Sequence, residues 1–518
     1  MRNKLSVLLV VSALTIGPAA AQDAAGFLEM ADGAIGASEV DSVHYTATGW
    51  MGAVGQNFAD GLDWPRTAVQ SYDMTIDYDT WSSREEYVRV QGDYPAQGGG
   101  GVPLQGEVRT VNLVSGDFAW ALNNQGEANP QNQNAELRRF MIAISPHGFI
   151  KSAMAADDVS ITDRYVQSQD RTLKVIGFTT MEKYRVTGEF NDQYMLERLI
   201  TRIPNPVMGD MQMEIRYEEW EDAGNGIQFP HVIHGHQGDH LLSARMGMNW
   251  INLEVDDVEI NVADAALTVP DNVRNAPAPQ VNVASTQLGN GVWLIAGGSH
   301  NSVAVEFNDY IAVIEGPQNE DRSIAVINEA KRLIPGKPIR YMINTHHHWD
   351  HLGGARTFVA EGATVVTHET NADLYRDVVF APQIRTLNPD RLSMNPFATT
   401  GPGPVALETV GDRHFITDGQ RTLFLYHVQG LQHATDMLIA YLPVEQIVVN
   451  ADLWSPPAQG AAPPANISAS AISLYNNLQR LNLPVATHVP IHGQPGPHTD
   501  FQRIVGPAAA AAQQQAAL

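Results

Sequence analysis

The sequence contains no cysteine at all. This absence excludes disulfide bridges, cysteine-based structural zinc sites and a lipoprotein anchor attached to cysteine. Any metal ion bound by this chain must therefore be held by nitrogen and oxygen ligands.

Positive charge is scarce, with 32 lysine and arginine residues against 57 aspartate and glutamate residues, a net charge of −25. Nucleic acids are bound through basic surfaces, so this balance excludes a nucleic-acid partner and favours a small-molecule substrate. No pattern in the sequence indicates an oligomeric state.

Long hydrophobic runs are also missing. The apolar segment Leu5–Ile16 falls short of the ~20 residues that a membrane-spanning helix needs. It follows Arg2 and Lys4 and precedes the small residues 19–21, which is the pattern of a secretory signal with cleavage after Ala21. We therefore predict an exported protein, in the periplasm or secreted, with no stable insertion into a membrane.

Residues 22–275 show mainly the period-two alternation of β-strands. Helical spacing appears at 25–37 and 134–155, and the strand-like segments are 74–78, 86–90, 108–113, 184–190, 211–217 and 252–255. The pattern predicts an antiparallel, β-rich α+β domain, with a sheet cupped around a helix as one natural closure.

A proline- and alanine-rich linker at 276–285 ends this domain. Strands then alternate with helices through part of 286–506, which predicts two mixed sheets sandwiched between helices. The segment 507–518 is rich in alanine and glutamine and is interpreted as a helical or frayed tail.

Four potential metal ligands lie within six residues, in a glycine-containing loop after the apolar strand 340–344. They are His346, His348, Asp350 and His351. A tight loop at the end of a strand can turn such side chains toward one point, whereas a regular strand alternates them between faces. Imidazole and carboxylate together suit zinc or iron.

Three further candidate ligands follow in order. His433 lies 82 residues beyond His351, Asp452 another 19 beyond, and His492 another 40 beyond. Each comes just after an apolar, strand-like run. If those strands are neighbours in one sheet, all the ligands project from the same edge.

At these residues the segment 286–506 resembles the metallo-β-lactamase-fold hydrolases. The loop matches that superfamily's H-x-H-x-D-H motif, and the three later residues match its His, Asp and His in order. The resemblance implies an αβ/βα sandwich and two zinc ions per chain. It places His346, His348 and His433 on the first ion, Asp350, His351 and His492 on the second, and Asp452 between them.

The chemistry implied by this ligand set is hydrolysis. A hydroxide shared by the two ions is the nucleophile, and Asp350 is the catalytic residue that accepts its proton. The sequence contains no G-x-S-x-G motif that would supply a nucleophilic serine instead.

Two departures from the pattern bear on the substrate. Asp452 stands where most β-lactamases of the superfamily carry cysteine or serine, and no lysine occurs after Lys337 to clamp a β-lactam carboxylate. These features favour an ester, lactone, amide or related bond. Two alternatives stay open: a thiol dioxygenase of the same fold with a single iron, and a non-enzymatic protein whose N-terminal cup captures an apolar ligand.

Residues near these motifs receive smaller predictions. His347 is expected to point away from the metals, and Asp436 is either a hydrogen-bond acceptor for a ligand histidine or a solvated carboxylate. His488 is interpreted as structural, and His300 receives no role. The loop 380–404 is either an apolar wall built from Leu392, Met394 and Phe397 or a segment that packs onto the N-terminal domain. The cluster His231, His234, His236 and His240 is predicted to lie at a rim without binding metal.

Overall fold

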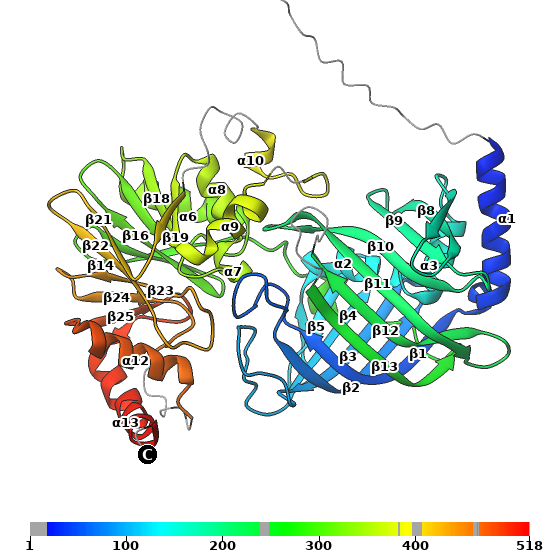
Figure 1. Ribbon diagram of the computed structural model, residues 1–518, viewed down its shortest axis with the longest axis horizontal. Coiled ribbons are helices and arrows are strands. Elements are labelled where there is room, and N and C mark those ends of the chain that lie inside the picture. The colour runs from blue at the N-terminus through cyan, green and yellow to red at the C-terminus, as the bar shows by residue number, and fades with distance from the viewer. Residues whose placement is uncertain are drawn as a thin grey trace, which may run out of the picture.

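The computed structural model describes residues 18–238, 248–381, 384–395, 407–458, 464 and 466–516. Of the residues with a prediction above, residues 1–17 of the export signal, His240 and Phe397 lie outside this part of the chain. Two lobes lie side by side, the N-terminal one in blue to green and the C-terminal one in green to red (Figure 1). None of the described helices combines the length and the apolarity needed to cross a membrane.

One antiparallel sheet of 13 strands makes up most of the N-terminal domain, in the order β6-β5-β4-β3-β2-β1-β13-β12-β11-β10-β9-β8-β7. The strands are β1 (Ser42–Gly52), β2 (Arg66–Asp77), β3 (Ser82–Val90), β4 (Val108–Ser115), β5 (Phe118–Leu122), β6 (Ala128–Pro130), β7 (Ser160–Val166), β8 (Arg171–Thr180), β9 (Tyr184–Phe190), β10 (Leu196–Asn205), β11 (Gly209–Asp222), β12 (Gln228–Gln237) and β13 (Met248–Ile260). The helices are α1 (Pro18–Ile35), η1 (Ala37–Glu39), η2 (Asn132–Asn134), α2 (Ala135–Ala143), α3 (Pro146–Met154) and α5 (Asp271–Arg274).

The large sheet curves around α2 and α3, as the predicted cup requires (Figure 1). On β1, the buried residues Val43, Tyr45 and Ala47 alternate with more exposed ones. Phe140 and Phe149, from α2 and α3, are fully buried in the core that results. The helical segment expected at 134–155 is two helices, because Pro146 cannot donate the backbone hydrogen bond of a continuous helix and instead begins α3.

Residues 276–283 contain no helix or strand and lead into the C-terminal domain. Its seven-stranded sheet runs β14 (Ala284–Gly289), β15 (Val292–Gly297), β16 (His300–Glu306), β17 (Ile311–Ile314), β18 (Ile339–Ile343), β19 (Thr364–His368) and β20 (Leu407–Val410). Its six-stranded sheet runs β21 (Arg413–Thr417), β22 (Thr422–His427), β23 (Leu438–Leu442), β24 (Ile447–Asn450), β25 (Thr487–Pro490) and β26 (Gly496–Pro497). The helices are α6 (Glu320–Leu333), α7 (Trp349–Leu352), α8 (Ala355–Ala360), η3 (Glu369–Asn371), α9 (Ala372–Leu374), η4 (Tyr375–Val379), α10 (Arg391–Met394), α12 (Ala469–Leu481) and α13 (His498–Ala516).

The two sheets of this domain face each other and share one apolar core. Val303 and Ile343 from the first sheet belong to the same buried cluster as Leu425 and Val448 from the second. Helices α6 and α8 contact the first sheet, which gives the mixed sandwich that the sequence predicted. The alanine- and glutamine-rich tail continues α13, where Ala509 is fully buried.

The described part of the 380–404 loop packs onto the N-terminal domain. Arg385 donates hydrogen bonds to the backbone oxygens of Pro206 and Val207, and Thr386 contacts the carboxylate of Asp210. Leu392 is buried and Met394 is exposed, so among the described residues this loop forms no apolar wall.

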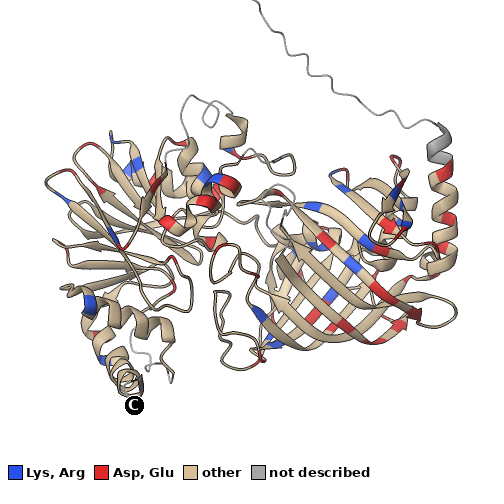
Figure 2. Cartoon of the chain, viewed as in Figure 1, with Lys and Arg blue, Asp and Glu red and all other residues tan. Residues whose placement is uncertain are grey.

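Acidic residues are spread over both lobes and do not gather in one region (Figure 2). On the strands of the large sheet, arginine and lysine side chains are interspersed with them (Figure 2). Pairs such as Arg198 with Glu189 therefore offset part of the net negative charge locally.

Candidate metal centre

The histidine-rich loop is held by backbone bonds at the end of β18. The amide of Thr345 donates to Glu315 Oε1 at 2.8 Å, and the amide of Leu438 donates to the oxygen of Thr345 at 2.7 Å. A Cβ atom at Gly354 would lie 1.7 Å from Ser323 Oγ, so only glycine permits the close approach of α6 behind the loop.

A first group of possible ligand atoms comes from His346, His348, His433 and Asp452. His346 Nε2 lies 2.9 Å from His348 Nδ1, 3.3 Å from His433 Nε2 and 3.2 Å from Asp452 Oδ2. Three ring nitrogens and one carboxylate oxygen thus converge on one point, which is the donor set of a four-coordinate site for zinc or a similar ion.

A second group lies beside it and consists of His300, Asp350, His351 and His492. His351 Nε2 lies 3.3 Å from His492 Nε2 and 3.7 Å from Asp350 Oδ2. His300 Nε2 lies 3.3 Å from the same oxygen of Asp350. The structure therefore brings together all seven predicted ligands and adds His300.

Asp452 contacts both groups. Its Oδ2 lies 3.0 Å from His433 Nε2 and 3.0 Å from His351 Nε2, while its Oδ1 lies 2.9 Å from His492 Nε2. The backbone of Asp452 has a φ of 53°, a left-handed conformation that is uncommon outside glycine. Strain of this kind often marks a functional position, and here it aims the carboxylate between the two groups.

The outer ring nitrogens of four ligand histidines are held by oxygen atoms. His346 Nδ1 lies 3.0 Å from Thr345 Oγ1, and His348 Nε2 donates to the backbone oxygen of Asn57 at 3.0 Å. Likewise, Nδ1 of His351 donates to Glu315 Oε2 at 3.1 Å, and Nδ1 of His492 donates to the oxygen of Ser299 at 2.8 Å. Such bonds select the tautomer whose inner nitrogen carries the free lone pair that a metal needs.

The charges in the site also suit a cation. Burial lowers the pKa of His346 to about 4 and lowers the pKa of His348 well below its usual value, so both rings are neutral donors at neutral pH. Burial acts the same way on His351, but the carboxylates of Asp452 and Glu315 outweigh it and raise the pKa of His351 well above 6.5. The carboxylates thus create a negative potential that favours positive charge between the groups.

The β1–β2 loop of the N-terminal domain reaches the loop that carries the metal ligands. Gln56 Nε2 donates to Asp350 Oδ1 at 2.7 Å, and the oxygen of Asn57 also accepts from His347 Nε2 at 2.9 Å. Trp349 packs edge-on against Trp64, with ring centroids 5.1 Å apart. The site therefore contains residues of both domains.

A cleft of about 1080 Å³ opens over the two groups. One wall comes from the C-terminal domain and includes Asp350, His433 and Asp452, while the facing wall comes from residues 95–105 of the β3–β4 loop together with Gln56. The wall facing the metal ligands thus comes from the N-terminal domain, and no described residue of the 380–404 loop lines this cleft.

The neighbouring residues behave as follows. His347 points away from both groups, as predicted, and its Nδ1 donates to Asp436 Oδ1 at 2.6 Å. Asp436 is therefore neither solvated nor bonded to a ligand, because its buried carboxylate is bonded to His347 and Asn371. His488 is buried and pairs with His498, which agrees with a structural role.

His231, His234 and His236 lie on β12, apart from the two groups of possible ligands. Sequence reasoning missed the role of Glu315 and gave none to His300. Glu315 directly follows the fully buried strand β17, and an ionisable residue at that position was the available signal.

Residues 295–490 match the model of the family described as Metallo-beta-lactamase superfamily. This C-terminal domain belongs to that superfamily. The two His/Asp groups of the metallo-beta-lactamase domain fit a binuclear metal centre.

Solved structures similar to the chain include three metallo-beta-lactamases. The protein from Pontibacter korlensis is 18% identical, with a TM-score of 0.32 and coverage of 45% of this chain and 99% of its own. The one from Hirschia baltica is 20% identical, with a TM-score of 0.30 and coverage of 43% and 96%. FIM-1 from Pseudomonas aeruginosa, in its mono-zinc form, is 19% identical, with a TM-score of 0.30 and coverage of 44% and 97%. No curated protein matches the chain.

Proposed function

We propose that the protein is an exported hydrolase with two zinc ions per chain that cleaves an ester, lactone, amide or related bond in an uncharged small molecule. The observation that carries this proposal is the contact of Asp452 with both ligand groups. One ion would be held by His346, His348 and His433, the other by Asp350, His351 and His492, and Asp452 would serve both. His300 would donate a hydrogen bond to Asp350 or complete the second set.

Two bound zinc ions would supply a water ionised near pH 7 and would polarise the oxygen of the scissile bond. The protein's own contribution is to place a proton acceptor. Burial would raise the pKa of Asp350, but the hydrogen bond from His300 and a positive charge beside the carboxylate, carried by protonated His351 or by a bound ion in its place, outweigh it and hold this pKa below its usual range. Asp350 is therefore ionised at neutral pH, faces the cleft, and can accept the proton that the attacking water loses.

The charge of the cleft supports an uncharged substrate. Its described lining holds glutamines, glycines, prolines and serines but neither lysine nor arginine. A carboxylate or phosphate on the substrate would find no basic side chain among the described lining residues, and only the metal ions could pair with its charge. The amides of Gln56, Gln97 and Gln432 instead offer hydrogen bonds to neutral polar groups.

The N-terminal sequence pattern supports export. Arg2 and Lys4 precede an apolar run, and small residues precede Gln22, which is the pattern of a cleavable secretory signal. The test is N-terminal sequencing of the protein recovered from the periplasm or the medium. Recovery only from the cytosol, with residues 1–21 still attached, would contradict export.

The activity test is a panel of chromogenic esters, lactones, amides, phosphodiesters, sulfate esters and a cephalosporin, assayed with and without a chelator. We expect two zinc ions per chain by metal analysis and chelator-sensitive cleavage of a neutral ester, lactone or amide. Asp452→Ala should bind fewer than two ions, while Asp373→Ala, on the exposed surface of α9, should bind two. A single iron with oxidation of a thiol would instead identify the dioxygenase.

A further inference from the structure

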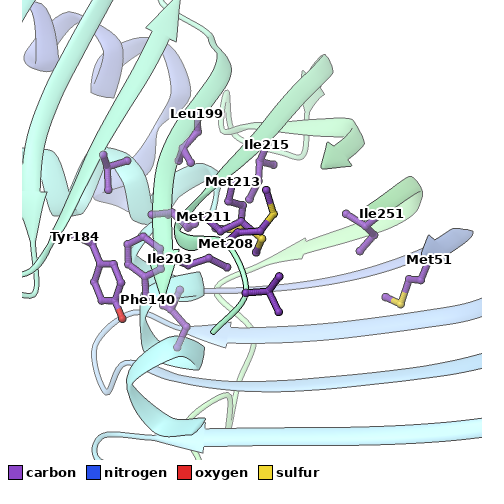
Figure 3. Close-up of a cluster of buried hydrophobic side chains, with 14 of the residues drawn as sticks. Met51, Phe140, Tyr184, Leu199, Ile203, Met208, Met211, Met213, Ile215 and Ile251 are labelled. Carbon is purple, nitrogen blue, oxygen red and sulfur yellow. The ribbon is translucent and has the colours of Figure 1, made fainter. Parts of the chain in front are cut away.

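A second cavity lies inside the N-terminal domain, between the curved sheet and helix α2. Its volume is about 300 Å³, and none of its lining residues belongs to the metal cleft. Figure 3 shows part of its apolar wall, with Met213 and Ile215 on one strand and Ile251 and Met51 on two others. The cavity is thus a separate candidate site that the proposed hydrolysis does not use.

Aromatic side chains form another part of the wall. Tyr45 and Tyr72 stack with ring centroids 5.9 Å apart, and Tyr72 and Tyr87 stack at 6.3 Å with ring planes only 9° apart. Methionines from three strands and from α2 complete the lining. Aromatic rings and flexible thioethers form favourable contacts with a flat apolar molecule.

One end of the cavity is polar and contains Arg138 and Glu85. The hydrogen bonds that these two side chains already make show which of their donor and acceptor positions are left for a ligand. The two terminal nitrogens of Arg138 are already bonded within the protein. Nη1 donates to the backbone oxygens of Leu113 and Trp120, and Nη2 donates to the side-chain oxygens of Asn112 and Gln131. These four bonds use all four protons of its two terminal nitrogens.

The carboxylate of Glu85 has hydrogen-bond acceptor positions that no described residue occupies. Its Oε1 accepts one hydrogen bond from Tyr72 Oη at 2.9 Å, and its Oε2 accepts one from Asn112 Nδ2 at 3.0 Å. A carboxylate has about four acceptor positions, so roughly two remain for a ligand. Because the positive charge of Arg138 offsets the negative charge of Glu85, the group of a ligand that best fits this end is an uncharged hydrogen-bond donor.

Solvent reaches the cavity beside α2. Leu137 is 41% exposed and Met141 is partly exposed, and both side chains line the cavity. A small molecule can therefore enter without unfolding the sheet.

We propose that this cavity binds a mainly apolar molecule of roughly ten to twelve non-hydrogen atoms whose hydroxyl or amine donates to Glu85. The size follows from the volume, which is twice that of the ~150 Å³ apolar cavities that hold a benzene ring. A fatty acid or other carboxylate is excluded as the preferred ligand, because it would bring a second negative charge against Glu85 while the terminal nitrogens of Arg138 are already bonded to other groups.

Equilibrium dialysis of the full-length, metal-loaded protein with 2-naphthol, 2-naphthoate and naphthalene tests the proposal. We expect saturable binding of 2-naphthol at one site per chain, at least about tenfold tighter than 2-naphthoate, and no change when a chelator removes the metals. Absence of saturable binding, or tighter binding of 2-naphthoate, would overturn it. Loss of binding with the metals would assign the ligand to the other cleft and overturn it too.

Two variants locate the site. Met141→Trp fills the entrance and should weaken 2-naphthol binding at least tenfold, whereas the same change at the exposed Met154 of α3, outside the cavity lining, should leave it unchanged. Glu85→Gln keeps the shape and should weaken 2-naphthol about tenfold while naphthalene binds as before. If Met141→Trp does not fold, the proposal is still tested by comparing the binding of 2-naphthol and naphthalene to Glu85→Gln. Equal loss or equal retention of both ligands would refute the role of Glu85.

Discussion

Gln56 Nε2 donates a hydrogen bond of 2.7 Å to Asp350 Oδ1, across 294 positions of sequence and from one domain to the other. The oxygen of the same Gln56 amide accepts from the backbone of Gly100 at 2.8 Å, so the side chain joins both N-terminal loops to the candidate proton acceptor. The next residue, Asn57, supplies the carbonyl that orients His348. The N-terminal domain thus helps to build the metal centre in addition to covering it.

Replacing Gln56 with leucine should lower kcat/KM of the chelator-sensitive hydrolysis about 10- to 100-fold, because the carboxylate of Asp350 loses the donor that orients it. The loss should fall mainly on kcat, since the fault lies at the reacting centre. Steady-state kinetics with metal analysis measure it. Gln420→Leu, in an exposed loop of the C-terminal domain, is the matched control, and equal activity of both variants would contradict a role for Gln56.

Gly55 and Gly61 offer a matched pair in one loop. Both have positive φ, of 77° and 82°, but a Cβ atom at Gly55 would lie 2.5 Å from the ring of Trp349, whereas one at Gly61 would meet nothing within 4 Å. Gly61→Ala should cost only about 1 kcal/mol of backbone strain. Gly55→Ala should in addition push the loop off Trp349 and lower activity, which thermal unfolding and rate measurements can separate. Identical behaviour of the two variants would show that this contact does not matter.

Glu315→Gln should weaken the binding of one metal ion about 10- to 100-fold. The buried carboxylate accepts hydrogen bonds from His351 Nδ1 and from the amide of Thr345, and an amide cannot accept at both of its ends. Competition with a colorimetric zinc chelator measures the affinity. Glu29→Gln, exposed on α1, should retain full affinity, and unchanged binding in Glu315→Gln would argue against its role in orienting His351.

His147 should make the N-terminal domain acid-sensitive. Burial lowers the pKa of this imidazole from 6.5 to about 4, so between these values the unfolded chain binds a proton and the folded chain does not. Stability is therefore unaffected above pH 6.5 and falls as the pH drops toward 4, by about 2 kcal/mol between pH 7 and pH 5. Urea unfolding followed by tryptophan fluorescence measures the change.

His147→Gln should unfold with a pH dependence smaller by that amount, and the amide can keep the hydrogen bond to the backbone oxygen of Gln228. His44→Gln is the control, because His44 lies partly exposed beside Asp73. The same slope in wild type and His147→Gln would exclude His147 as the cause.

Much of the fold was predictable because strands and helices are encoded by local periodicity. The strand at 340–344 and the helix at 321–333 correspond to β18 and α6 to within a residue. The ligand positions were also predictable, since side chains that follow apolar strands collect at sheet edges. The ligands come from the edges of two sheets: His346 follows β18 in the seven-stranded sheet, whereas Asp452 and His492 follow β24 and β25 in the six-stranded one.

The residues that support the ligands could not be found in the same way. Asn57 acts through its backbone oxygen, which every residue possesses and which leaves no trace in the sequence. Gln56 is an ordinary loop glutamine until the second domain places it against Asp350. The buried Asp436 accepts a hydrogen bond from His347 and not from a metal ligand. This pairing could not be predicted, because only the folded loop determines which imidazole faces the carboxylate.

By itself, the sequence determined which side chains are able to hold metal ions, since the types and intervals of His346, His348, Asp350, His351, His433, Asp452 and His492 are properties of the chain. Only the tertiary structure decided how these side chains are oriented, and it added His300, Glu315 and the N-terminal loops to the site. The physical reason is the range of the interactions. Periodicity acts between neighbours in the sequence, whereas the rings of His348 and His492 are oriented by Asn57 and Ser299, which lie 291 and 193 positions away.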